Sequence, residues 1–317
     1  MNGWGRLAAT VSSIPGVKVR ENEPMTRHTT LQTGGPADLY IVVEHARALE
    51  SVLGVLTSEG CPWLIAGAGS NLLVMDDGIE GAVVTLGNGL GGHSIVPGDL
   101  PVVKAGGAMA LGALLAAVEK AGMSGLEFLT GIPGTVGGAV AMNAGTRYGY
   151  VDSMLESVDL VSAAGPVRVE ASELGLGYRT SSIPAGSIVV SATLRLRTGR
   201  WPEGEQVAAT LSELRRKNHP PASGTAGSFF RNPDPAANLF AGQLIEECGL
   251  KGYRVGGAIV SHKHANFLMN GGDATAADLL NLARHVVDTV RTMKGVTLTR
   301  EVRLVGRGAI EWQELVP

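Results

Sequence analysis

The sequence predicts an α+β protein, with a glycine-rich N-terminal two-thirds and a smaller α/β C-terminal part. Three observations lead to this fold class. A strand, a helix and a strand follow one another near the N-terminus, short strands dominate from residue 82, and helices alternate with strands beyond residue 206. No internal repeat is evident. The 317 residues are enough for two domains and a sizeable core.

The N-terminal elements begin with "ADLYIVVE" (37–44), which predicts a strand. The next segment, 45–60, predicts an amphipathic helix that ends at the cap glycine Gly60. Four apolar residues recur in it at helical spacing: Leu49, Val52, Leu53 and Leu56. "WLIAGAGSNLLV" (63–74) then predicts a short buried strand that breaks into a glycine turn.

The middle of the chain predicts short strands in "AVVTL", "HSIV" and "PVVKAG", followed by one helix that ends at Gly122. Residues 131–145, "GIPGTVGGAVAMNAG", are here called the glycine stretch. They are too rich in glycine for a good helix and too small-sided for ordinary core. A hairpin around Ala164 and Gly165 and a strong strand, "SIVVSATLRLR", follow.

The C-terminal part begins after a polar candidate linker, "TGRWPEGEQ" (198–206). Helices are expected at about 205–217 and 236–248, the second with Phe240, Leu244 and Cys248 on one face and Gly249 as its cap. The clearest helix starts at the N-cap Thr275 and stops at Gly295. A terminal strand, "VTLTREVRLVG", closes the pattern.

Composition excludes several classes of protein. A net charge of −3 argues against broad binding to nucleic acid. Cys61 and Cys248 stand far apart without metal-ligand spacing, so we expect no metal site and two buried thiols. The sequence has no signal-peptide core and no apolar run of 18 residues, which predicts a cytoplasmic protein without membrane insertion.

Three glycine-rich segments raise the question of a nucleotide ligand. "GNGLGG" (87–92) matches a dinucleotide-binding pattern, but strands rather than a helix follow it, so a turn is the better interpretation. "AGAGSN" (66–71) follows a strand and can present several N–H groups to an anion, although a simple tight turn explains it equally well. The glycine stretch favours a phosphate-rich ligand that lies against the main chain.

Seven motifs occur in an order that carries a resemblance: "TTLQTGGPADLYI", "IAGAGSNLLVMDDGIEG", "SGLEFLTGIPGTVGGAVAMNAG", "LGYRTSSI", "AGSFFRNP", "GLKGYRVGGAIVSHKHANFLMN" and "REVRLVG". From about residue 26 to 306 the sequence resembles the UDP-N-acetylenolpyruvoylglucosamine reductase family. The longer tyrosine-bearing loop of one branch is missing after "GYR", so the chain resembles the shorter, type II branch.

The resemblance implies a fold of the vanillyl-alcohol-oxidase (PCMH) type, with FAD extended between two α+β subdomains and a third domain that covers the substrate. The implied ranges are an N-terminal extension with the first helix (1–25), an FAD-binding domain (26–199) and a substrate-binding domain (200–317). The FAD-binding domain would divide into subdomains at about 26–80 and 81–199.

The resemblance also implies a cofactor site made largely of main chain. Its expected FAD-binding residues are Gly34, Gly35, Gly67, Ala68, Gly69, Ser70, Asn71, Thr130, Gly131, Ile132, Pro133, Gly134, Gly137, Gly138, Asn143, Ala144 and Gly145. Neither 67–71 nor 130–145 contains histidine or cysteine, so the FAD is expected to be non-covalent. Physical reasoning alone reaches only a phosphate-rich ligand held by backbone.

Three residues are implied as catalytic: Arg179 beside the enolpyruvyl group, Ser228 as proton donor and Glu301. Each has an ordinary alternative, namely a surface arginine, a turn serine and a solvent-facing strand glutamate. Arg179 and a protonated Glu301 would stabilise the charge that develops when hydride reaches C3, and Ser228 would protonate C2. NADPH is the implied hydride source.

The implied substrate, UDP-N-acetylglucosamine enolpyruvate, carries a diphosphate and a carboxylate and requires a basic pocket. The expected substrate-binding residues are Arg215, Arg231, Asn232, Lys251 and His264. Arg231 stands where the family often has lysine, and Arg215 could be simply a solvated helix charge. Two other functions stay open: a carbohydrate oxidase of the same fold, and a nucleotide-binding protein without catalysis. A monomer or weak oligomer is expected.

Overall fold

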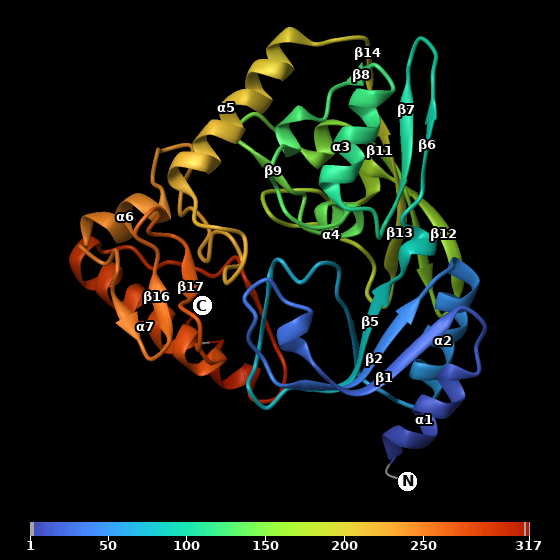
Figure 1. The fold of residues 1–317 in the computed structure, drawn as a ribbon, viewed down its shortest axis with the longest axis horizontal. Helices are drawn as coiled ribbons and strands as arrows, with labels where there is room; N and C mark the ends of the chain where they lie inside the picture. Colours follow the sequence, from blue (N-terminus) through green and yellow to red (C-terminus); the bar gives the residue numbers. More distant parts are fainter. Residues whose placement is uncertain (1–2, 314, 317) are drawn as a thin grey trace. The chain divides into compact units, whose positions relative to one another are not determined.

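The computed structural model describes residues 3–313, 315 and 316, and so omits the outermost residues of the expected first and last domains. Figure 1 shows its elements in chain order. The α-helices are α1 (Gly3–Ser12), α2 (Ala46–Ser58), α3 (Leu111–Lys120), α4 (Val136–Ala141), α5 (Pro202–Asn218), α6 (Ala241–Glu247) and α7 (Ala276–Lys294). None of the described helices is long and apolar enough to span a membrane.

The described chain divides into two compact units. Unit 1 contains residues 1–21, 39–68 and 81–214, and unit 2 contains residues 22–38, 69–80 and 215–317. Two N-terminal segments therefore belong to the same unit as the C-terminal part of the chain. This division by compactness differs from the expected domain boundaries, which placed residues 26–80 in one subdomain.

A sheet of order β1-β2-β5-β3, in which β3 and β5 run parallel, has most of its residues in unit 1. Its strands are β1 (Val17–Pro24), β2 (Pro36–Val43), β3 (Trp63–Ile65) and β5 (Ile79–Leu86). The four apolar residues predicted for α2 are all buried in the core that includes this sheet and α1. Gly60 follows α2 with a φ of +62°, which confirms the predicted stop.

The second layer of unit 1 is an antiparallel sheet of order β12-β11-β13-β7-β6. Its strands are β6 (His93–Val96), β7 (Val102–Gly106), β11 (Leu155–Ser162), β12 (Gly165–Glu170) and β13 (Ile188–Arg195). The hairpin predicted around Ala164 and Gly165 joins β11 to β12. Helices α3 and α4 contribute to the core on one face of this sheet. Short pairs complete the unit: β8 (Met123–Ser124) with β14 (Arg197–Thr198), and β9 (Gly145–Thr146) with β10 (Gly149–Tyr150).

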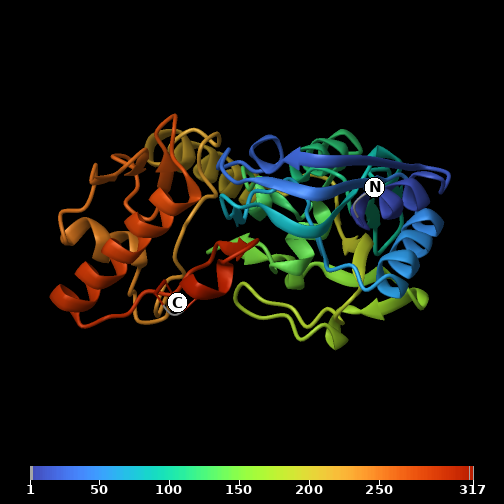
Figure 2. The same ribbon diagram turned by 90° about the horizontal axis from the view of Figure 1, so that it is seen from below.

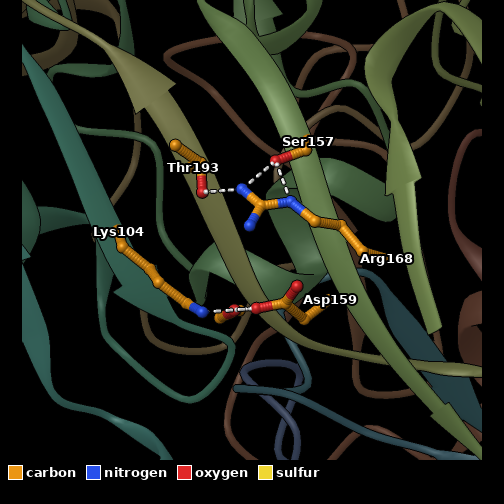
Figure 3. A network of polar contacts seen from close by, with 6 residues as sticks. Lys104, Ser157, Asp159, Arg168 and Thr193 are labelled. Carbon is orange, nitrogen blue, oxygen red and sulfur yellow. Dashed lines mark hydrogen bonds and ion pairs between the residues drawn. The ribbon is translucent and has the colours of Figure 1, made fainter. Parts of the chain in front are cut away.

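A polar network crosses four strands of this second sheet (Figure 3). Lys104 Nζ lies 2.6 Å from Asp159 Oδ2, which also accepts a hydrogen bond from Ser191. Arg168 donates to Ser157 through Nε and Nη2, at 3.1 and 2.7 Å. Burial alone would raise the pKa of Asp159, but the hydrogen bonds from Lys104 and Ser191, with the charges of Lys104 and Arg168, lower it overall.

Unit 2 has its core between helices and two small sheets. The antiparallel sheet β15-β16-β17 consists of β15 (Arg254–Val255), β16 (Ala258–Val260) and β17 (Leu268–Asn270). The parallel pair is β4 (Leu72–Val74) with β18 (Arg303–Val305). Helix α7 packs along the antiparallel sheet, as Figures 1 and 2 show, and buries eight of its residues. Thr275 caps α7 through a capping box and Gly295 ends it with a φ of +69°, as predicted.

Four expectations about elements need correction. The glycine stretch does contain a short helix, α4, because Thr135 Oγ1 accepts a hydrogen bond from Gly138 N and so caps its start. Helix α6 begins at 241 instead of 236, because Asp234 Oδ1 takes the amides of Ala236 and Ala237 into a turn. Phe240 is consequently exposed.

The other two corrections concern extended segments. Helix α5 already starts at Pro202, so the irregular linker covers only residues 199–201. Proline suits the first turn of a helix because it needs no N–H partner there. The expected terminal strand narrows to β18, 303–305, although burial still alternates through Leu298 and Val302.

Candidate active site

Ser228 and Glu301 stand on neighbouring segments of unit 2. Phe229, the residue after Ser228, accepts a hydrogen bond from Glu301 N at 2.9 Å through its carbonyl oxygen. Arg231 N donates to Thr299 O at 2.9 Å, which extends the pairing by two residues. Both candidate side chains are half-buried. Two residues that are 73 positions apart in the sequence are thus held on adjacent main chain.

Asn266 supports the Ser228 segment from another side. Its buried side-chain amide donates to Phe230 O at 2.8 Å and accepts from Phe230 N at 3.0 Å. One side chain therefore provides hydrogen-bond partners for both main-chain polar groups of Phe230. Asn266 O also accepts from Phe229 N at 2.7 Å. Sequence reasoning missed this residue, although it lies in the quoted "HANF" segment.

Asn71 supports the Glu301 segment. Its side-chain Nδ2 donates to Glu301 O at 3.2 Å, and its carbonyl accepts from Arg303 N at 3.0 Å. Residues 228–231, 299–303, Asn266 and Asn71 are called the catalytic frame below. The frame contains one of the expected cofactor residues, Asn71, together with two of the expected catalytic residues.

The other expected cofactor residues of unit 2 are glycines and Ser70. Gly69 has a φ of +65°, and a Cβ there would overlap His28 O and lie 2.8 Å from Thr29 Cα. Gly34 and Gly35 similarly lie against residues 74–78. The protein itself therefore requires these glycines, because Gly35 and Gly69 pack on main chain and Gly34 packs on the Val74 side chain.

The glycine stretch of unit 1 is also packed closely by the protein. A Cβ on Gly137 would lie 3.1 Å from Val189 O and 3.2 Å from Gly107 O, so α4 sits directly on strand backbone. The amides of Val136 and Gly137 donate to Met109 O and Gly107 O. Together with the Gly138 N–H that Thr135 takes, three amides of this helix start are engaged within the protein. Gly138 differs from its neighbours, because a Cβ there would meet only Thr135 Oγ1, at 3.5 Å.

The expected residue Gly67 approaches this stretch within unit 1. A Cβ on Gly67 would lie 2.8 Å from Thr135 Oγ1, so the segment that ends at Gly67 and Ala68 lies against Thr135. Thr135 directly follows five of the expected cofactor residues: Thr130, Gly131, Ile132, Pro133 and Gly134. Gly131 and Gly134 have φ angles of +73° and +128°. The structure thus brings together two segments that sequence reasoning assigned to one ligand.

Arg179 lies at the end of the glycine stretch. Its Nη2 donates to Gly145 O at 3.1 Å, and its guanidinium lies 5.4 Å from the Tyr178 ring centroid and 5.8 Å from that of Tyr150. Arg179 has a φ of +58°, which is rare for a residue with a side chain and costs about 1–3 kcal/mol. Such strain at a half-buried arginine fits a functional position.

Asn143 and Ala144 hold the stretch in place beside Arg179. The buried Asn143 side chain donates to Asp152 Oδ2 at 2.9 Å and to Gly177 O at 3.0 Å, and accepts from Asp152 N. Ala144 O accepts from Val151 N at 2.9 Å. Asn143 therefore has a structural role that the cofactor expectation did not include.

The expected substrate-binding residues all lie in unit 2, with different surroundings. Asn232 Oδ1 accepts from Ala241 N and so caps the start of α6. Lys251 Nζ lies 2.7 Å from Glu246 Oε1. Arg231 Nε is buried with no hydrogen-bond partner among the described residues, which leaves one donor for a ligand. Burial lowers the pKa of the Arg215 guanidinium, which stays charged at neutral pH.

His264 forms an aromatic cluster with a residue that sequence reasoning missed, His219. Their ring centroids lie 5.5 Å apart, and the Phe267 ring is 4.9 Å from each. Burial, with the nearby charges of Arg215 and His264, lowers the pKa of His219 to about 4. Burial and Lys251 also lower the pKa of His264. Neither ring adds positive charge at neutral pH, so the arginines and the lysine supply it.

Comparison with known proteins gives the family. A family model described as the C-terminal domain of UDP-N-acetylenolpyruvoylglucosamine reductase matches residues 219–305, and one described as an FAD binding domain matches residues 37–170. The UDP-N-acetylenolpyruvoylglucosamine reductase of Anoxybacillus flavithermus is 42% identical over 292 residues, which are 91% of this chain and 95% of the relative. The chain belongs to the UDP-N-acetylenolpyruvoylglucosamine reductase family.

Two further members of this family match nearly the whole chain. The reductase of Heliobacterium modesticaldum is 42% identical over 291 residues, 90% of each chain. The crystal structure of the reductase from Thermus caldophilus aligns with a TM-score of 0.77 at 35% identity, and covers 91% of this chain and 98% of that one. These findings confirm the resemblance, the fold class with its FAD-binding domain, and an FAD-dependent oxidoreductase.

The residues present fit an FAD group. The hydroxyl oxygens of Thr30 and Thr33 are buried and have no hydrogen-bond partner among the described residues. Thr30 is directly beside the expected cofactor loop, since its N–H donates to Gly69 O at 3.3 Å. Buried unpaired hydroxyls beside a glycine turn are what a polar ligand would satisfy. Sequence reasoning quoted this segment but selected only its glycines.

Proposed function

We propose that the enzyme reduces UDP-N-acetylglucosamine enolpyruvate to UDP-N-acetylmuramate, a precursor of peptidoglycan. FAD, when bound, supplies to C3 of the substrate a hydride that originates from NADPH. The observation that carries the proposal is the catalytic frame, in which Glu301 N is bonded to the carbonyl of the residue after Ser228. A half-buried serine and carboxylate on adjacent main chain suit a proton transfer at a defined carbon.

In this proposal Ser228 donates the proton that C2 requires after hydride arrives at C3. Arg179 and Glu301 stabilise the charge that develops on the enolpyruvyl carboxylate during that step. The strained backbone of Arg179 supports such a role, because strain of this kind persists where the surroundings over-determine a conformation. A non-catalytic nucleotide-binding protein would have no need of these three side chains.

The cofactor would lie against the expected glycine residues, with Ser70 and the Thr30 and Thr33 hydroxyls as polar partners. Gly138 supports this most directly, since the protein leaves space at its Cα. Arg215, Arg231, Lys251 and His264 would bind the diphosphate and carboxylate of the substrate. Asn232 would act there mainly by holding α6, because its side-chain oxygen caps that helix.

Three further expectations belong to this proposal. Residues 26–199 would form the FAD-binding domain and residues 200–317 the substrate-binding domain. The matched ranges 37–170 and 219–305 support these assignments. We expect a cytoplasmic location, because NADPH and nucleotide sugars are made there, and a monomer or weak oligomer.

The test separates the two half-reactions by stopped-flow absorbance. Purified protein should be yellow and should release intact FAD on acid treatment. NADPH should bleach the flavin, and UDP-N-acetylglucosamine enolpyruvate should restore its colour in the absence of oxygen. Colourless protein that takes up no FAD would contradict the proposal. Rapid oxygen-dependent turnover of simple sugars would indicate the oxidase instead.

A further inference from the structure

We propose that Asn71 is a positioning residue for Glu301, which connects the cofactor loop to the catalytic carboxylate. The inference rests on the proposed function and deepens it. Sequence reasoning assigned Asn71 only to FAD. The structure directs its side-chain Nδ2 to Glu301 O at 3.2 Å, across 230 positions of sequence.

The first step concerns how Glu301 is oriented. Its N–H donates to Phe229 O at 2.9 Å, and its carbonyl accepts from Asn71. These two bonds fix the peptide groups on both sides of the Glu301 Cα. Because the Cα–Cβ direction follows from φ and ψ, fixing both peptides also fixes the direction in which the carboxylate leaves the main chain.

The second step shows that Asn71 is built into the same strand pair as Glu301. Asn71 directly precedes β4, and Arg303, two residues beyond Glu301, opens β18 opposite Leu72. Asn71 O accepts from Arg303 N at 3.0 Å. Asn71 therefore holds Glu301 with its side chain and the residue two places later with its main chain.

The third step concerns the other end of the loop. Gly69 is packed so closely on His28 and Thr29 that no side chain fits there, and its carbonyl accepts from Thr30 N. The loop is thus fixed at Gly69 and again at Asn71, with Ser70 between them. A ligand that contacts this loop acts on an element that also sets the position of Glu301.

The experiment compares Asn71→Ala and Asn71→Asp with the unchanged enzyme. Aspartate keeps the size of asparagine but cannot donate to a carbonyl when ionised. Rates are expressed per bound FAD, because Asn71 also belongs to the expected cofactor loop. On that basis we expect flavin reduction by NADPH to stay within about threefold of the parent in both variants. Flavin reoxidation by the substrate should slow about 10- to 100-fold, the range that a small misplacement of a catalytic group produces. The pH profile of that half-reaction should shift.

Asn270→Ala is the matched control. Asn270 is a half-buried asparagine of the same unit, and its Nδ2 donates to Leu31 O at 3.1 Å, a bond like that of Asn71. Its Oδ1 also accepts from Gly272 N and Ala274 N, so its loss removes more side-chain bonds than the loss of the Asn71 bond to Glu301 O. This variant should leave the ratio of the two half-reaction rates and the pH profile unchanged. If the two variants behave alike, or if both half-reactions of the Asn71 variants fall in proportion to FAD content, the positioning role is wrong.

A second measurement does not depend on activity. Amide hydrogen exchange of residues 299–303 in the full FAD-loaded chain should be faster in Asn71→Ala than in the parent, because the peptide group that follows the Glu301 Cα loses the side-chain donor of its carbonyl. The main-chain bond from Arg303 N to the carbonyl of residue 71 is kept in this variant. Unchanged exchange there would overturn the inference. If instead the parent shows no substrate-dependent reoxidation, the proposed function fails, and the exchange result still decides whether Asn71 holds this strand.

Discussion

In the catalytic frame, the side chains that we propose to be catalytic stand on main chain that is hydrogen-bonded to other segments. Glu301 lies between Phe229 and Asn71, and the segment after Ser228 is held by Asn266. In the glycine stretch, by contrast, no catalytic side chain is expected, and main chain meets main chain directly. Gly137 lies on Val189 O, and Gly145 lies on Gly149 and Tyr150.

Substitutions in the two regions should therefore have different effects. A change of the Ser228 or Glu301 side chain would take away a group that we propose to react, and would leave the buried packing of the neighbouring Phe229 and Phe230 in place. A change in the glycine stretch adds atoms where the protein has no space, so it should affect stability and cofactor binding before rate. The half-reactions, FAD content and stability can therefore separate the two regions experimentally.

Ser228→Ala should have the largest effect. Loss of a general acid typically costs about 10²- to 10⁴-fold in rate. We expect this loss in flavin reoxidation by the substrate, whereas flavin reduction by NADPH and FAD content should change little, because the half-buried serine leaves no large cavity. Stopped-flow absorbance at both half-reactions measures the effect. Equal slowing of both halves would mean that Ser228 is structural.

The glycine stretch can be tested with a pair of substitutions. In Gly145→Ala the new Cβ would overlap Gly149 O and lie 2.6 Å from Tyr150 Cα, so we expect a loss of about 1–3 kcal/mol in the free energy of unfolding. Gly138→Ala meets only Thr135 Oγ1 at 3.5 Å and lies in a helix, where alanine is preferred by about 1 kcal/mol. The second variant should fold normally and bind FAD about tenfold more weakly.

Denaturant unfolding of the FAD-free proteins and a flavin titration distinguish these outcomes. The pair sharpens the comparison because one glycine is required by the protein and the other is required only by the proposed ligand. Full FAD affinity in Gly138→Ala would place the cofactor elsewhere. Unchanged stability in Gly145→Ala would show that this part of the stretch can relax.

The sequence was sufficient to predict the bounds of elements whose signals lie in neighbouring residues. Thr275 and Gly295 bound α7 as predicted, because both caps depend on neighbouring residues. It failed for α4, where the cap at Thr135 and the packing of Gly137 on Val189 outweigh the low helix propensity of glycine. Tertiary contacts of this kind leave no local pattern.

The same distinction applies to the candidate site. The motifs pointed to Ser228, Glu301 and the glycine loops, but the sequence cannot show that Glu301 N bonds to Phe229 O or that Asn71 reaches Glu301 O. The supporting residues Asn266 and His219 were missed because each acts through a contact distant in sequence. Sequence reasoning also explained the glycines by a ligand, whereas four of them lie directly against the protein's own main chain: Gly35, Gly69, Gly137 and Gly145.

His219 should make the free energy of unfolding depend on pH in the acidic range. Its pKa is lowered to about 4 in the folded protein from an ordinary 6.5. The unfolded chain therefore binds more protons between these values, so the free energy of unfolding should rise with pH from about 4 to 6.5 and then level off. His264, whose pKa is also lowered, acts in the same direction.

His219→Gln should reduce the slope of the unfolding free energy against pH. The reduction should be less than ~1.4 kcal/mol per pH unit, which is the slope for a difference of one bound proton between the unfolded and folded chains. Denaturant unfolding at pH 4.5, 5.5 and 7 measures it. Charged neighbours of the ring, Arg215 above all, are kept in this variant. A slope equal to that of the parent would mean that His219 titrates normally in the folded protein.

Asp159→Asn should have the smallest effect and provides a reference outside both regions. The pair of Asp159 with Lys104 is partly exposed, with 28% and 49% of their side-chain surfaces accessible, so its loss should cost about 0.2–1 kcal/mol at neutral pH. Because the folded-state pKa of Asp159 is depressed, this stabilisation is present above its ordinary pKa and disappears as the pH falls through the lowered value. It should also shrink in about 1 M salt, where screening is strong. Unfolding at low and high salt measures both effects, and both half-reactions should keep the parent's rates. A change in either half-reaction rate would mean that any loss of stability in unit 1 slows catalysis. The different effects of substitutions in the catalytic frame and in the glycine stretch would then reflect stability alone.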